Sequence, residues 1–284
     1  MTTAPRRRPR PPAASPLRPL PGGDPAAARP SRAAELVAEL RDEILRGARP
    51  PGARLPAERE LAETRGLSRS SVREALQQLE QLGLVAIRHG GGAVVRPVED
   101  ASLDVLPHLL LAPGAPRRDL VEQALEVQAT LMGAAVRLAL RHADAGERAG
   151  ARALLRRLAD PAIGDAEYFG AIEALVQLVS SASRNLVLRL VRNGLRSALL
   201  SPELRRWIEG ERGLRAQLRP PREVLRPVVR RIEQALADGD AAAAEESVQR
   251  LFAVTREHLL RALDEASGAR RRATRSRRPG GAPA

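Results

Sequence analysis

The amino-acid sequence predicts a mainly α-helical protein that carries one small β-hairpin in its N-terminal third. Apolar residues recur at helical spacing through most of the 284 residues, without long alternating segments. The hydrophobic fraction of 43% is rich in Ala, Leu and Val, whereas aromatic residues make up only 1%. This composition suits packed helices better than a β-sandwich or barrel. The exception is a pair of short apolar runs on either side of a glycine-rich turn near residue 90.

The composition excludes several classes of enzyme and metal protein. The formal net charge is +13, and because the sequence has no lysine, all 47 positive side chains are arginines. A chain without lysine has neither a Schiff-base lysine nor the phosphate-binding lysine of a Walker motif. A chain without cysteine has no disulfide, no thiolate zinc site and no cysteine nucleophile. Because His89, His108, His142 and His258 are widely scattered, we expect no catalytic site.

Residues 1–30 are expected to be a disordered arm, and residues 267–284 a disordered basic tail. Both are rich in Arg, Pro, Ala and Gly, and they lack the periodicity that would bury a face. These two ends hold nearly all of the excess positive charge, so the body between them is close to neutral. Such arms can hold DNA phosphates without sequence preference, although the solvated arms of an arginine-biased protein fit the composition equally well.

Neither a secretory signal nor a membrane-spanning stretch is predicted. The N-terminal arginines are followed by no continuous apolar segment. No uncharged apolar stretch reaches the roughly 18 residues that a membrane helix needs. We therefore expect a cytoplasmic protein that associates with the nucleoid through DNA and has no membrane partner.

Three short helices are predicted before the hairpin. Ser31 is a suitable N-cap for the first helix, and Gly47 ends it. Pro56 suits the first position of the second helix, which Gly66 closes. Ser68 can cap the third helix, in which apolar residues recur at the spacing of one buried face, namely Val72, Ala75, Leu76, Leu79 and Leu82.

The hairpin follows Gly83, which ends the third helix. Short strands are expected at residues 84–87 and 93–95, and the turn between them contains three consecutive glycines. Three helices followed by a hairpin form a winged helix-turn-helix. Residues 31–98 are therefore predicted to be a DNA-binding domain.

The third helix is the part predicted to contact the bases of DNA. If its apolar face packs inward, Arg69, Ser70 and Arg73 must point outward. Arginine grips guanine O6 and N7 with two parallel hydrogen bonds, and serine hydroxyls near a helix start reach phosphates. A glycine-rich wing lets the backbone approach DNA, and His89 there can probe the minor groove. On pattern alone, a merely solvated Arg/Ser face fits about equally well.

Several short motifs follow one another within this domain. They are Pro51-Gly52, Leu55-Pro56-Ala57-Glu58-Arg59, Gly66-Leu67-Ser68-Arg69, Val72-Arg73-Glu74-Ala75-Leu76 and Gly83-Leu84. With these motifs the segment closely resembles, without a gap, the winged-helix domain of the GntR family of bacterial transcription regulators. The wing, with Ile87 before His89-Gly90, looks most like the fatty-acid-responsive FadR branch of that family.

The resemblance implies a role for each matching residue. Two arginines of the third helix should be the main base and phosphate readers, an arginine of the second helix should contact the backbone or a base, and the wing tip should add a contact. Arg59 has an alternative, which is an ion pair with Glu63 on its own helix, and for Glu58 caps and intrahelical pairs are preferred. The residues assigned to DNA contact are Arg59, Ser68, Arg69, Ser70, Ser71, Arg73, His89 and Gly90.

Residues 99–117 are expected to be a linker with a short helix, and residues 118–266 a helical domain. Its helical order resembles the FadR-type C-terminal domain, and the matching pieces include Ala182-Ser183-Arg184-Asn185 and Gly239-Asp240. The resemblance implies an all-α antiparallel bundle that dimerises and binds a small effector. Apolar periodicity predicts helices at about residues 118–142, 145–159, 165–182, 185–200, 220–238 and 241–265.

Most members of that domain hold a divalent metal with an Asp-x3-His pair on one helix and two later histidines. The corresponding positions here are all apolar, and they hold Ile172, Val176, Val229 and Leu251. These side chains supply no electron pair to a metal, so we predict no metal and no cofactor. A shifted metal site is the alternative, and it would combine His258 with Asp165, Glu167 or Glu173.

An apolar bundle interior favours an effector with a hydrocarbon part, such as a carboxylic acid or an acyl-CoA-like molecule. The aromatic residues Tyr168, Phe169 and Trp207 either line such a cavity or simply pack in the core. The predicted protein is a homodimeric, ligand-responsive transcription regulator that reads an inverted-repeat operator, as a repressor or an activator. The alternative is an architectural DNA-binding protein without an effector, which holds DNA through its arginine arms.

Overall fold

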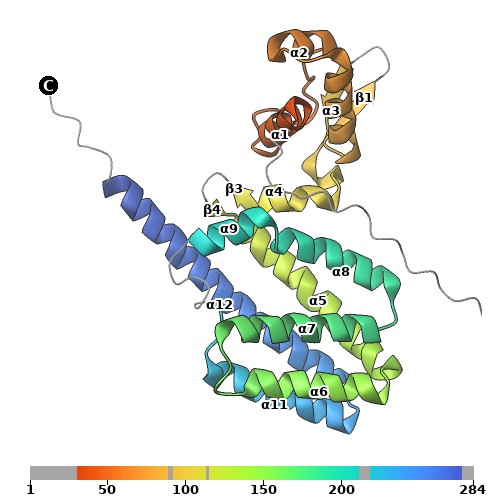
Figure 1. Ribbon diagram of the computed structural model, residues 1–284, viewed down its shortest axis with the longest axis vertical. Coiled ribbons are helices and arrows are strands. Elements are labelled where there is room, and N and C mark those ends of the chain that lie inside the picture. Colours follow the sequence, from red (N-terminus) through yellow and green to blue (C-terminus); the bar gives the residue numbers. More distant parts are fainter. Residues whose placement is uncertain (1–30, 89–91, 113–114, 211–217, 277–284) are drawn as a thin grey trace, which may run out of the picture.

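The computed structural model describes residues 31–88, 92–112, 115–210 and 218–276, and it is mainly α-helical as the sequence predicts. A small N-terminal domain lies above a larger helical bundle, with the short helix α4 between them (Figure 1). Within these ranges no helix is long and apolar enough to cross a membrane.

The N-terminal domain is a winged helix-turn-helix, which confirms the predicted fold. The two strands pair antiparallel, with Val85 opposite Val95. One apolar core joins all three helices and both strands, so the recognition helix and the wing are held on a common base. The elements are α1 (Arg32–Leu45), α2 (Glu58–Arg65), α3 (Arg69–Gln81), β1 (Val85–Arg88) and β2 (Gly92–Val95).

Side-chain caps explain where two of these helices begin. The Ser31 hydroxyl accepts a hydrogen bond from the Ala34 backbone N–H at 3.2 Å. The Ser68 hydroxyl accepts one from the Ser71 N–H at 3.1 Å. Each cap satisfies an amide that would otherwise lack a partner at the helix start. Gly66 ends α2 in the left-handed region, with a φ of +60°.

Gly83 brings the end of α3 into close contact with the segment that leaves the wing. Its φ is +74°, and a Cβ at this position would lie 2.9 Å from the Asp100 carbonyl oxygen and 3.0 Å from Ala101 Cα. Next to it, the Ser102 backbone N–H donates a hydrogen bond to the Leu82 carbonyl at 2.9 Å. Glycine therefore meets a need for both conformation and space.

The linker is more structured than the sequence predicts. In addition to the expected short helix, it contains two 3₁₀ turns and a second tiny hairpin, whose strands of two residues each are too short for a periodicity argument. The elements are η1 (Val98–Asp100), η2 (Leu103–Val105), α4 (Leu106–Leu110), β3 (Leu111–Ala112) and β4 (Ala115–Pro116).

Helix α4 contacts both domains. On one side, His108 Nε2 lies 3.1 Å from Arg41 Nη1 of α1. On the other side, Leu110 is fully buried with Val121 and Trp207 in an apolar cluster of the bundle. The burial of His108 lowers its pKa, and the charge of Arg41 lowers it further. A neutral imidazole can accept a hydrogen bond from the guanidinium, so this contact joins the two domains.

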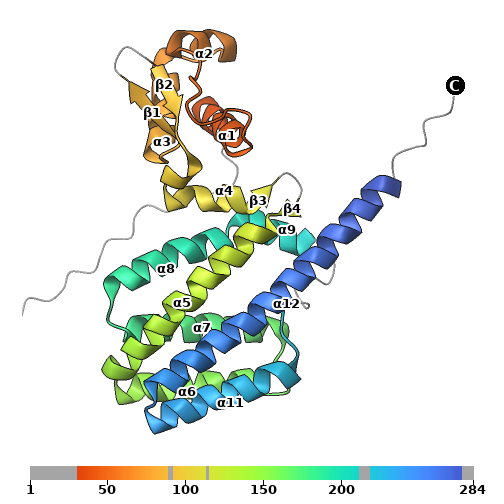
Figure 2. The ribbon, with the colours of Figure 1, turned by 180° about the vertical axis from the view of Figure 1, so that it is seen from behind.

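The bundle is built around the antiparallel pair α5 and α12, which lie side by side in both views (Figures 1 and 2). The ion pairs Arg118–Asp264 and Arg137–Glu245, both 3.1 Å, connect opposite ends of the two helices and fix their direction. The helices are α5 (Arg118–His142), α6 (Ala145–Ala159), α7 (Asp165–Ala182), α8 (Leu186–Leu199), α9 (Pro202–Gly210), α11 (Arg222–Asp238) and α12 (Ala241–Ser276).

Two helices of the bundle differ from the helix boundaries that the sequence predicts. Helix α9 was not predicted, because Ser201-Pro202 indicates a break but is also a good helix start. Helix α12 continues to Ser276, so the prediction of a disordered tail from residue 267 is wrong over this part. Alanine and arginine favour helices, and the first proline after this point is Pro279.

Candidate nucleic-acid interface and ligand cavity

Helix α3 buries its apolar face and exposes its arginines, as the sequence predicts. Val72, Ala75 and Leu79 are fully buried in the domain core, whereas Arg69 and Arg73 are exposed. Arg69 makes no ion pair or side-chain hydrogen bond with any described residue. Its five N–H donors are therefore available to a partner outside the chain.

The three serines at the start of α3 form one hydrogen-bonded group. The Ser68 hydroxyl lies 2.8 Å from the hydroxyls of both Ser70 and Ser71, in addition to capping the helix. Ser68 and Ser70 are exposed, while Ser71 is half-buried. The helix start therefore presents hydroxyl donors beside the positive end of the helix dipole, a combination that suits a phosphate.

Arg73 is held by a residue of the neighbouring helix, which the sequence analysis did not anticipate. Its Nη2 lies 2.9 Å from Glu58 Oε2 of α2, and its Nε lies 3.4 Å from Glu58 Oε1. The hydrogen bond from Arg73 to Glu58, together with the carboxylate charge, raises the pKa of Arg73. Glu58 therefore makes an interhelical pair instead of the preferred intrahelical one, and it orients Arg73 on the exposed face.

The other predicted contact residues have separate outcomes. Arg59 lies 3.4 Å from Glu63 on its own helix, which is the alternative that the sequence analysis left open. His89 and Gly90 lie outside the described residues, so the wing-tip contact stays a prediction. The base of the wing is fixed, because Glu80 of α3 accepts a hydrogen bond from the Ile87 N–H at 2.8 Å.

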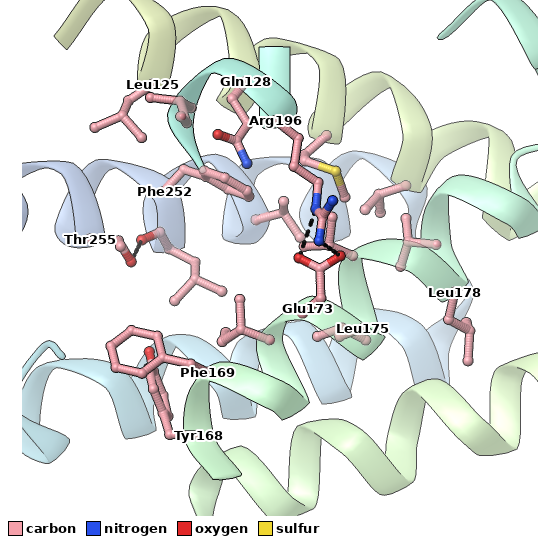
Figure 3. Close-up of a pocket in the computed structure, with 18 of the residues that line it drawn as sticks. Leu125, Gln128, Tyr168, Phe169, Glu173, Leu175, Leu178, Arg196, Phe252 and Thr255 are labelled. Atoms are coloured by element: carbon pink, nitrogen blue, oxygen red, sulfur yellow. Dashed lines mark hydrogen bonds and ion pairs between the residues drawn. The ribbon is translucent and has the colours of Figure 1, made fainter. Parts of the chain in front are cut away.

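A cavity of about 700 Å³ lies inside the bundle, and seven helices from α5 to α12 contribute to its wall (Figure 3). Such a volume is typical of small-molecule sites. The wall is mainly apolar. It includes Ile172, Val176 and Leu251, which stand at three of the four positions where most FadR-type C-terminal domains carry metal ligands. Val229, the fourth, is fully buried in the adjoining core.

Aromatic residues occupy one end of this cavity. Tyr168 and Phe169 line it as an edge-to-face pair, with ring centroids 5.4 Å apart. Burial raises the pKa of Tyr168 to about 12, although the nearby Arg219 guanidinium, 4.8 Å from the ring centroid, acts in the opposite direction. Trp207 packs in the cluster beside α4 and does not belong to the cavity wall.

One ion pair lies on the cavity wall. Arg196 of α8 binds Glu173 of α7 with two parallel contacts, Nε to Oε2 at 3.0 Å and Nη2 to Oε1 at 2.8 Å (Figure 3). Partial burial pushes the pKa of Glu173 upward, but hydrogen bonds from Arg196 and Gln177 outweigh this effect, so the pKa lies below its usual value. The carboxylate is therefore ionised at neutral pH.

The alternative metal site near His258 is not formed. Among the described residues, no group of three or more His, Asp or Glu side chains comes together in a way that could hold a metal ion. Asp165 pairs with Arg219, and Glu167 pairs with Arg157. These carboxylates pair with arginines of α6 and of the segment before α11 instead of converging on His258.

Two family models match the chain in succession. The model of bacterial regulatory proteins of the gntR family covers residues 32–95, and the FCD domain model covers residues 123–261. The two matches coincide with the winged domain and with the helical bundle.

Curated relatives match a part of the chain. An uncharacterized HTH-type transcriptional regulator of Mycobacterium tuberculosis is 40% identical over 96 residues, which is 34% of this chain and 39% of that protein. The fatty acid metabolism regulator protein of Yersinia pestis is 34% identical over 149 residues, or 52% of this chain and 60% of that protein. The chain thus spans about 40–60% of the length of these relatives.

A solved structure matches most of this chain. It is that of Lar, which is described as controlling expression of the Listeria monocytogenes agr system. It is 19% identical, covers 83% of this chain and 99% of its own, and has a TM-score of 0.48.

Proposed function

We propose that the chain is a sequence-specific transcriptional regulator that responds to a small molecule, because its winged domain matches the gntR family of bacterial regulatory proteins and its helical bundle matches the FCD domain. One observation carries the DNA-binding part of this proposal: helix α3 places its leucines in the core and its arginines on the surface. The proposed role implies that the protein acts in the cytoplasm, at the nucleoid.

In the proposed complex, α3 lies in the major groove. Arg69 reads a base with its unengaged guanidinium, and Arg73 reaches a base or phosphate from the position in which Glu58 holds it. Ser68, Ser70 and Ser71 bind a phosphate at the helix start, and Arg59 contacts the backbone after leaving Glu63. His89 and Gly90 complete the interface at the wing tip.

We propose that two copies bind one inverted repeat through an interface on helix α8. Four apolar side chains on this helix, Leu186, Val187, Leu190 and Val191, are 44–70% exposed, although α8 belongs to the bundle. They make up nearly half of the large exposed hydrophobics among the described residues. A cluster of exposed apolar side chains supports an interaction site here, and the same patch on two copies is self-complementary around a two-fold axis.

The effector is proposed to bind in the bundle cavity. The apolar wall supports a ligand with a hydrocarbon part, either a carboxylic acid or an acyl-CoA-like molecule. The relative from Yersinia pestis, which is named a fatty acid metabolism regulator, points in the same direction. The apolar residues at the metal-ligand positions support a site without metal.

A continuous set of contacts connects this cavity with the DNA-binding domain. Leu204 and Ile208 of α9 line the cavity, and α9 also packs against α4. In turn, α4 contacts α1 through His108 and Arg41. A ligand that displaces α9 would therefore change how the winged domain is held, and so shift the population that fits the operator.

The proposal is tested by selecting an operator from random duplex DNA and measuring binding by fluorescence anisotropy. A regulator yields an inverted repeat, whereas an architectural protein yields no consensus. A variant without residues 1–30 and 277–284 separates the two further. We expect it to keep its sequence preference while the salt dependence of nonspecific binding falls, and loss of all preference would favour the architectural alternative.

A further inference from the structure

Helix α8 buries an arginine that has no carboxylate partner among the described residues. Arg192 is 1% exposed and is the largest fully buried side chain among the described residues. Its Nη2 donates hydrogen bonds to the side-chain oxygens of Gln177, at 3.0 Å, and Asn193, at 2.6 Å. Its Nε and Nη1 are buried without any hydrogen-bond partner in the described structure. Buried charges are normally paired, so this arrangement is unusual.

Arg192 belongs to a network that begins at the cavity wall. Glu173 of α7 is bound on one side by Arg196, and its Oε1 also accepts a hydrogen bond from Gln177 Nε2 at 2.9 Å. The same Gln177 amide accepts from Arg192 through its oxygen. Two guanidinium groups one turn apart on α8 therefore face one carboxylate and one neutral amide on α7.

This network carries one positive charge in excess. Burial lowers the pKa of Arg192, while the nearby Glu173 charge raises it and the charges of Arg196 and Arg189 lower it. Glu173 cannot neutralise both arginines, because both of its oxygens are engaged with Arg196. A single additional anion would balance the set and give the unsatisfied N–H groups a partner.

We propose that the cavity binds a hydrocarbon ligand with one carboxylate, and that Arg192 makes the site selective for that single negative charge. This inference rests on the proposed function, in which the cavity is the effector site. The ligand carboxylate binds Arg196 at the wall, and Glu173 turns along α7 toward Arg192. The result is two ion pairs in place of one pair and one unpaired cation.

The same charge count disfavours an uncharged head group. An uncharged ester leaves Arg192 as unsatisfied as it is without a ligand. The site therefore distinguishes a free carboxylic acid from its neutral ester.

The experiment compares octanoate and decanoate with their methyl esters on the full-length chain, by isothermal titration calorimetry. We expect each carboxylate to bind at least about tenfold more tightly than its ester. Arg192→Met should remove this preference, whereas Arg231→Met, which changes an exposed arginine on α11, should retain it. Equal affinity of acid and ester for the wild type, or an undiminished preference in Arg192→Met, would overturn the proposal, as would failure of both carboxylates to bind.

A second variant tests the charge balance without removing the arginine. Gln177→Glu supplies the missing anion from within the chain, so it should raise the melting temperature of the ligand-free protein and weaken carboxylate binding about tenfold or more. Binding of the methyl esters should not change. Unaltered carboxylate affinity in this variant would refute the inference. Operator binding of each ligand-free variant is measured in parallel, because it tests the proposed function separately.

Discussion

Replacing Gly83 with alanine should destabilise the winged domain through two effects that the structure separates. Gly83 has a φ of +74°, and its missing side chain leaves room for the Asp100 carbonyl oxygen, which would be 2.9 Å from a Cβ. Gly47, in the same domain, has a φ of +76°, but no atom lies within 4 Å of the place that its Cβ would take. Gly47→Ala is therefore a matched control for the conformational effect alone.

The expected magnitudes follow from this geometry. An alanine in the left-handed region costs about 1–2 kcal/mol, and the smaller entropy of the unfolded alanine chain offsets roughly 0.4–1 kcal/mol of that cost. Steric overlap with backbone atoms, which cannot rotate away, adds about 1–3 kcal/mol at Gly83. We therefore expect Gly83→Ala to lower the free energy of unfolding by about 2–4 kcal/mol, and Gly47→Ala by about 1 kcal/mol.

Hydrogen–deuterium exchange of peptides from α1 and α3 is the suitable assay, because it reports opening of this domain separately from the bundle. The exchange of α3 amides in Gly83→Ala should be about tenfold or more faster than in Gly47→Ala, which corresponds to about 1.4 kcal/mol. Equal exchange in the two variants would show that the contact with Asp100 has no energetic consequence. The close packing of α3 against residues 100–102 would then not explain the need for glycine at this position.

Other outcomes test the interfaces. Arg69→Ala should lower operator affinity about 5- to 150-fold in an anisotropy titration, as expected for one lost bidentate contact. Arg231→Ala, at an exposed position on α11, should leave operator affinity unchanged. Equal operator affinities of the Arg69→Ala variant and the unaltered chain would contradict the role of α3. Leu190→Glu should raise the dissociation constant of the dimer at least about tenfold in sedimentation experiments. Val224→Glu, on α11, should leave the dimer intact. A dimer that persists in Leu190→Glu would rule out the α8 interface. Treatment with EDTA should leave the melting temperature unchanged, and a fall would reveal a bound metal.

The sequence predicts the recognition helix well because every local determinant agrees there. Ser68 caps it, apolar residues such as Val72 and Leu79 recur at helical spacing, and Gly83 ends it. The pairing of Arg73 with Glu58 could not be predicted in the same way. It depends on how α2 crosses α3, which is set by packing of the whole domain and not by spacing within one helix.

The buried arginine on α8 escapes sequence-based prediction for a different reason. Arg192 follows Leu188 by four positions and precedes Leu195 by three, so helical periodicity places it on the buried face. Arginine is almost never fully buried unless it is paired, and residue type alone therefore predicts a solvated position within an apolar helix. Periodicity is the better guide here, and the conflict between residue type and position indicates a functional constraint.

An apolar cavity that recognises an anion needs a positive partner, which can be a bound metal ion or a guanidinium group. A metal ion requires several ligating side chains, and the positions that would supply them hold residues such as Ile172 and Val176 on the cavity wall. A guanidinium requires none, because it offers two parallel N–H donors that match a carboxylate directly. The excess arginine charge beside Arg196 and the apolar character of the metal-ligand positions are therefore two parts of one arrangement, in which hydrogen bonds replace coordination as the means of holding the ligand.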